Sequence, residues 1–125
     1  MAEGNDGFLC RTVSLRKEKR LHGSVREWLA AAKRDRGIYS KKYGGVHYLL
    51  ISSGMKPNQG YRLVLERVER EPRPKVLVRE VSPPEGGMYP QVLTYPYLVL
   101  QVKGQLPQVL DASTGELFIQ EEEGP

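Results

Sequence analysis

The sequence predicts an α+β fold that is mostly β, with one N-terminal helix and antiparallel sheets. Only residues 24–36 show a helical apolar pattern, and from residue 46 onward apolar segments of strand length alternate with turns rich in Gly, Pro and Asn. The short connections favour antiparallel pairing. We therefore expect a small β-sandwich or barrel of about seven strands. Residues 1–125 form one domain of ordinary size, with loose ends at 1–7 and 121–125.

The helix has the clearest signals. Ser24 and Glu27 match a capping box, in which each side chain bonds the other residue's backbone amide. Apolar residues then recur on one face, and basic residues lie near the C-terminal end, where the helix dipole stabilises positive charge. Gly37 is the expected terminator. Trp28 is expected to anchor this helix on the sheet. The apolar stripe consists of Val25, Trp28, Leu29 and Ala32.

The expected strands are apolar or alternating segments bounded by turn residues. Pro96 separates the last two segments of the central region, and because it lacks an N–H it belongs at an edge, a bulge or a strand start. A hairpin turn is expected at 111–115. The strand segments are 8–15, 46–52, 61–68, 75–82, 91–94, 97–102, 108–110 and 116–119.

Charge is unevenly distributed along the chain. The net charge is +4, but residues 1–45 hold 11 Lys/Arg against 5 Asp/Glu, whereas residues 46–125 hold 8 against 10. Basic clusters of this kind attract acidic partners or nucleic acid, although most are solvated faces. The N-terminal third is therefore the candidate for a nucleic-acid binder. We rank that function low because no aromatic residue interrupts the basic run 16–20.

The residues for catalysis or metal binding are sparse. The chain has two histidines, His22 and His47, and one cysteine, Cys10, without the spacing of a zinc, calcium, phosphate-loop or nucleophile motif. We therefore expect no enzyme activity, no metal and no cofactor. Neither a signal peptide nor an apolar run of membrane-spanning length is evident, so the expected location is the cytoplasm unless a leader has been removed.

Two loops rich in Pro and Gly carry the candidate partner-binding residues. The first covers 54–60 and the second covers about 83–90, with more aromatic residues up to 97. Tyrosine is common at recognition surfaces, although Tyr61 and Tyr97 are expected to pack beneath the loops. The residues expected to shape the loops are Gly54, Pro57, Gly60 and Pro96. The expected contact residues are Lys56, Asn58, Gln59, Met88 and Tyr89.

Three motifs in the same order resemble one known family. GMKPNQGY, REVSPPEGG and QVLTYPY are similar to the C-terminal domain of PrcB, over about residues 46–103. Asn58-Gln59 departs from the Thr-Gly of the family pattern. The resemblance implies a non-enzymatic accessory protein that associates with a protease and stabilises it. The matching residues are Gly54, Lys56, Pro57, Gly60, Tyr61, Pro83, Thr94, Pro96 and Tyr97.

Two further interpretations remain open. The segment with Pro57, Gly60 and Tyr61 also resembles a loop of chagasin-type cysteine-peptidase inhibitors, which implies peptidase inhibition, but a counterpart of that family's R-P-W loop is missing. An exposed sheet edge would support strand addition by a partner or a homodimer. The leading hypothesis is a protein-interaction module whose partner is a protein, possibly a protease, rather than nucleic acid.

Overall fold

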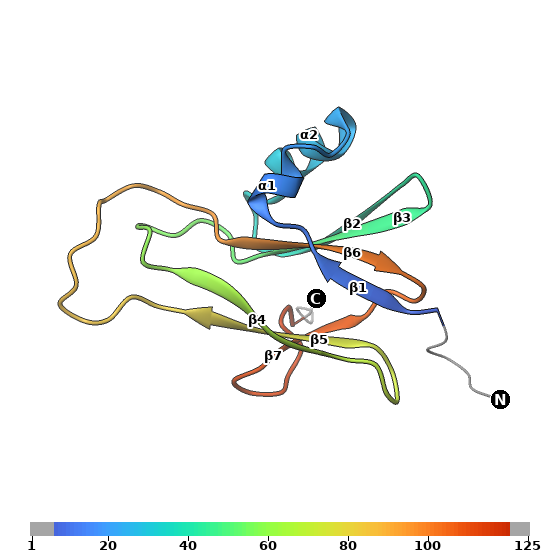
Figure 1. Cartoon of the computed structure of the whole chain (residues 1–125). Coiled ribbons are helices and arrows are strands. Elements are labelled where there is room, and N and C mark those ends of the chain that lie inside the picture. The colour runs from blue at the N-terminus through green and yellow to red at the C-terminus, as the bar shows by residue number, and fades with distance from the viewer. Residues whose placement is uncertain (1–6, 121–125) are drawn as a thin grey trace, which may run out of the picture.

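A computed structural model describes residues 7–120 and contains two β-sheets and a layer of helices (Figure 1). The first sheet has the strand order β1-β6-β3-β2, and the second has the order β4-β5-β7. The elements are β1 (Leu9–Thr12), α1 (Leu15–Glu18), α2 (Gly23–Ala32), β2 (Gly37–Tyr43), β3 (Val46–Ser52), β4 (Arg62–Glu69), β5 (Lys75–Val81), β6 (Tyr97–Lys103) and β7 (Gln108–Asp111). The two sheets remain separate, which confirms the mostly β prediction in its sandwich form.

The main core lies between the two sheets. Because side chains alternate along a strand, Leu49 and Ile51 of β3 and Leu100 of β6 face the second sheet. Val76 and Val78 of β5 meet them from the other side. Residues 48–51 are apolar without a break because β3 is covered on both faces.

The second core lies between α2 and the outer face of the first sheet, as Figure 1 shows. Val25 and Leu29 of α2 pack on Tyr48, Leu50 and Val99. Trp28 is half-buried in the same cluster, so its predicted anchoring role is confirmed. In the described part of the chain, neither helix is long and apolar enough to cross a membrane.

The predicted helix begins within one residue of its expected start, but its cap and its end differ from the prediction. Its N-cap is His22, whose ring nitrogen accepts a hydrogen bond from the Ser24 amide at 3.0 Å, so Ser24 and Glu27 lie inside the helix and form no capping box. The helix ends at Ala32 rather than near residue 36. The Ser52 hydroxyl donates to the Lys33 carbonyl at 2.6 Å, which satisfies a backbone acceptor that the helix leaves free.

Two elements were not predicted. Strand β2 follows the helix directly and forms a hairpin with β3, in which Tyr43 pairs with Val46. Gly44 and Gly45 have φ values of +63° and +81°, as a type I′ turn requires, and glycine reaches these values without strain. The single turn of α1 begins at Ser14, whose hydroxyl accepts from the Lys17 amide at 3.2 Å. The strand expected at 8–15 therefore ends at Thr12.

Three expectations about strands are corrected. Segments 91–94 and 116–119 are not strands, because each forms a single bridge, Lys56 with Thr94 and Leu110 with Leu117. The pair β5·β7 is parallel rather than antiparallel. The chain crosses from β5 to β6 in the other sheet and then returns, and two reversals leave β7 running in the direction of β5. The loose ends expected at 1–7 and 121–125 lie outside the described residues, except for Gly7.

Candidate functional site

Two loops that cross between the sheets lie side by side at one end of the sandwich (Figure 1). The first crossover loop, residues 53–61, joins β3 to β4, and the second crossover loop, residues 82–96, joins β5 to β6. The Lys56 amide donates to the Thr94 carbonyl at 2.8 Å, and the Thr94 amide donates back to Lys56 at 2.9 Å. The Ser53 amide also donates to the Pro96 carbonyl at 2.9 Å. The loops predicted as a binding surface are thus joined by their backbones.

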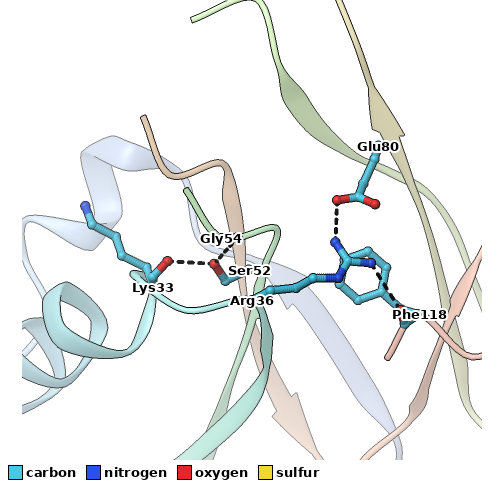
Figure 2. A network of polar contacts seen from close by, with 6 residues as sticks. All are labelled: Lys33, Arg36, Ser52, Gly54, Glu80 and Phe118. Atoms are coloured by element: carbon cyan, nitrogen blue, oxygen red, sulfur yellow. Dashed lines mark hydrogen bonds and ion pairs between the residues drawn. The ribbon is translucent and has the colours of Figure 1, made fainter. Parts of the chain in front are cut away.

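Two glycines allow the chain to turn at places where a side chain would collide. Gly54 has a φ of +84°, and an added Cβ would lie 3.1 Å from the Arg36 Cβ and backbone nitrogen. The Ser52 hydroxyl accepts a hydrogen bond from the Gly54 amide at 3.0 Å (Figure 2). A Cβ on Gly60 would lie 2.5 Å from the Pro83 Cβ. Gly60 therefore sets the close approach of the first crossover loop to the second.

The five predicted contact residues differ in exposure. Gln59 and Met88 are exposed, and 95% of the Met88 surface is accessible. Lys56, Asn58 and Tyr89 are half-buried. The Asn58 side-chain oxygen accepts from the Gly60 amide at 2.8 Å, and the Lys56 ammonium lies 5.6 Å from the centre of the Tyr61 ring. Asn58 thus has a role inside the loop, and contact of all five with a partner remains a prediction.

The residues predicted to shape the loops also differ in their exposure to solvent. Pro57 is exposed at the turn of the first crossover loop, whereas Pro96 is half-buried where the second loop enters β6. Tyr61 and Tyr97 are half-buried too. Their packing beneath the loops remains a prediction.

Exposed apolar side chains gather on the two loops, and of these only Met88 was predicted as a contact. Met55 is 57% exposed, Val92 is 48% and Leu93 is 59%, in addition to Met88. The prediction missed Val92 and Leu93 because a strand at 91–94 would have hidden part of this apolar surface. Groups of exposed apolar side chains often mark interaction sites. We call Met55, Met88, Val92 and Leu93 the apolar loop surface.

A groove of about 420 Å³ lies beside the second crossover loop. One wall is formed by Tyr61–Val64 at the start of β4, and the other by Thr94–Val99. Val13 and Leu15, which follow β1, lie at its rim. A groove with this mainly apolar lining can accept an aliphatic or aromatic side chain from a partner.

A polar network fixes the turn between α2 and β2 next to the first crossover loop (Figure 2). Arg36 donates to Glu80 of β5 at 2.6 Å and to the Phe118 carbonyl at 3.3 Å. Its guanidinium also lies 4.3 Å from the centre of the Phe118 ring. Since the Arg36 backbone lies against Gly54, this network connects the helical layer, the second sheet and the loop.

Tyr97 and Glu18 form a polar contact between β6 and α1. The Tyr97 hydroxyl donates to the two Glu18 carboxylate oxygens at 2.7 and 2.8 Å. Burial, followed by the hydrogen bond and charge of Glu18, raises the pKa of Tyr97 well above its usual range. The hydroxyl therefore stays protonated and keeps donating when ordinary tyrosines have ionised.

The Tyr97 contact predicts an alkaline loss of stability. Above pH about 10, tyrosine ionises in the unfolded chain but not in the folded one, so the unfolded state binds fewer protons and the free energy of unfolding falls as pH rises. We expect Tyr97→Phe to reduce this fall, measured by urea unfolding at pH 8 and near pH 11. Tyr89→Phe, which leaves Glu18 paired, should keep the slope of the unmodified protein. An unchanged slope in Tyr97→Phe would contradict the assignment.

The residues capable of nucleophilic chemistry do not converge. Cys10 and His47 both pair with Val102 of β6, on opposite sides of it, so a full strand separates them. Burial raises the pKa of the Cys10 thiol, which disfavours the reactive thiolate. His22 caps α2 and stacks on Tyr43, with 4.6 Å between ring centres. Within residues 7–120, no group of three His, Cys, Asp or Glu side chains could hold a metal ion.

Comparison with known proteins identifies one family. Residues 47–103 match the family described as PrcB C-terminal, which confirms the resemblance carried by the three motifs. The match begins inside β3 and ends with β6, so it includes both crossover loops. No curated protein and no solved structure matches the chain.

Proposed function

We propose that this protein is a non-enzymatic interaction module that attaches to a protease complex, because residues 47–103 match the family described as PrcB C-terminal and the resemblance to PrcB implies an accessory role at a protease. The observation that carries the proposal is the apolar loop surface. Met55, Met88, Val92 and Leu93 expose about half or more of their surface on two loops of the matched segment. Such side chains lose contact with water when a partner covers them.

The backbone of the site supports recognition rather than catalysis. Reciprocal hydrogen bonds between Lys56 and Thr94 and the close packing of Gly60 on Pro83 hold the loops together before a partner arrives. A site that is ordered in advance loses less conformational entropy on binding. The adjacent groove between Tyr61 and Tyr97 would accept one apolar side chain of the partner.

We expect the variant Met55→Ser/Met88→Ser/Val92→Ser/Leu93→Ser to keep its fold and lose its partner. These side chains contribute little to the core because they are exposed. Tagged protein would be used to recover partners from native lysate, with quantitative mass spectrometry of the bound fraction. We expect the unmodified protein to enrich a protease or a subunit of its complex, and the variant to recover at least about tenfold less, since a few buried apolar contacts supply several kcal/mol.

The matched control is Leu9→Ser/Leu106→Ser, which removes exposed apolar side chains that are not on the crossover loops. It should recover the partner as well as the unmodified protein does. Equal recovery by the four-residue variant would reject the apolar loop surface. Adding Gln59→Ala and Tyr89→Phe separately would test two of the four remaining predicted contacts.

Peptidase inhibition, the alternative function, would use the same loops in a different way. Inhibition requires that the first crossover loop, with Pro57 and Tyr61, enter a peptidase cleft. A panel of cysteine and serine peptidases separates the two functions, because an accessory module leaves their rates unchanged at micromolar concentration.

A homodimer also remains a prediction: β2 and β4 are edge strands of their sheets in the described chain.

A further inference from the structure

A small basic groove lies between the two helices, apart from the crossover loops. Its volume is about 140 Å³. Three positive charges come from Lys19, which follows α1, from Arg26 of α2, and from Lys33, which directly follows α2, and Glu18 contributes one negative charge. The Tyr97 ring and the side chains of Leu29 and Ala30 complete the lining. The basic excess of the N-terminal third is thus partly concentrated at one hollow.

The spacing of the cations follows from helix geometry. Arg26 and Lys33 are seven residues apart, which places them on one face of α2 about two turns, or roughly 10 Å, from each other. Lys19 adds a third charge from the neighbouring helix. An extended chain rises about 3.3 Å per residue. Acidic side chains two or four residues apart lie on the same side of an extended segment, about 7 or 13 Å from each other, and these distances bracket the spacing of Arg26 and Lys33.

These cations have no carboxylate partner within the described chain. The ion pairs among residues 7–120 are Arg36 with Glu80, Arg67 with Glu69, and Arg79 with Glu66. Glu18 accepts from the Tyr97 hydroxyl, and the Lys33 ammonium lies over the Tyr97 ring, 4.9 Å from its centre. The groove lining therefore has a net charge of +2, and no ion pair within residues 7–120 neutralises it.

We propose that this groove binds an acidic segment of a partner protein, with the carboxylates of the segment reaching Lys19, Arg26 and Lys33. Charge complementarity carries the proposal, because three cations converge on a hollow large enough for a carboxylate group. The site is distinct from the apolar loop surface, so it would add a second point of attachment.

The same geometry disfavours nucleic acid. Single strands bind through open aromatic faces as well as phosphate contacts. The two rings near the groove already contact cations: Lys33 lies over Tyr97, and the Arg34 guanidinium lies 6.0 Å from the centre of the Tyr95 ring.

The test measures binding of a labelled peptide in which glutamate alternates with glycine, by fluorescence anisotropy on the full chain. A peptide with glutamine in place of glutamate and a labelled oligothymidine of similar length are compared with it. We expect the acidic peptide to bind best, and Arg26→Gln/Lys33→Gln to weaken it about tenfold, since tenfold corresponds to about 1.4 kcal/mol for two charge contacts. Raising the salt from about 0.05 to 0.3 M should weaken binding by the unmodified protein.

The matched control is Arg73→Gln/Lys103→Gln, which removes the same charge from two exposed positions outside the helices. It should change the affinity less than about twofold. If Arg26→Gln/Lys33→Gln is destabilised, Lys19→Gln/Arg26→Gln, at two exposed positions, replaces it. Three results would overturn the proposal: equal binding by the groove variant, no preference for glutamate over glutamine, or tighter binding of the oligonucleotide. None of them bears on the apolar loop surface.

Discussion

Replacing Leu100 with alanine is expected to lower the free energy of unfolding by about 3 to 4 kcal/mol. Leu100 is fully buried in β6, the strand that lies between β1 and β3 in the first sheet. Its side chain faces the core shared by the two sheets. Truncation removes apolar contacts and leaves a cavity that two hydrogen-bonded sheets cannot easily close.

Urea unfolding followed by the fluorescence of Trp28 would measure the loss for Leu100→Ala. Leu106→Ala provides the control, because Leu106 is 38% exposed in the loop between β6 and β7. Its expected effect is below about 1 kcal/mol. A loss below about 1 kcal/mol for Leu100→Ala would show that the two sheets do not pack as described.

Gly60→Ala is expected to force the two crossover loops apart. The new Cβ would lie 2.5 Å from the Pro83 Cβ and 3.0 Å from the Asn58 side-chain oxygen. The proline ring cannot rotate away, so backbone must move, at a cost of about 1 to 3 kcal/mol. The Asn58 hydrogen bond to the Gly60 amide would be strained by the same methyl group.

Hydrogen exchange of the Lys56 and Thr94 amides reports directly on this separation, because each amide donates to the backbone carbonyl of the other residue. Both should exchange faster in Gly60→Ala, and partner recovery should fall with them. Gly23→Ala is the control, because its added Cβ meets no atom within 4 Å and Gly23 does not have a positive φ. Unchanged exchange in Gly60→Ala would mean that Gly60 does not set the loop spacing.

The strands of the sandwich could be predicted where burial of one or both faces leaves an alternating or continuous apolar pattern in the sequence. Alternation at 61–68 and the apolar runs at 46–52 and 97–102 correspond to β4, β3 and β6. Strand β2 gave no such signal, because polar residues fill much of this edge strand. The end of α2 could not be predicted either, because the backbone carbonyl of Lys33 is satisfied by Ser52, which lies in a strand 19 residues further along the chain.

The candidate site was predictable in its loops but not in its surface. Turn residues identified the loops, since glycine and proline meet local backbone demands, such as the positive φ of Gly54. Exposure depends on the contacts of neighbouring chain segments. Asn58 is half-buried because it bonds to Gly60, whereas Val92 and Leu93 are exposed because 91–94 forms a single bridge rather than a strand.

Both crossover loops span the gap between the sheets at the same end of the sandwich. Each is a covalent connection between the two sheets: one runs from β3 of the first sheet to β4 of the second, and the other runs from β5 of the second sheet to β6 of the first. A partner that binds both crossover loops at once would oppose any movement of one sheet relative to the other. Binding would therefore stabilise the domain against separation of its two sheets by force. An accessory protein built in this way would gain rigidity from the assembly to which it attaches.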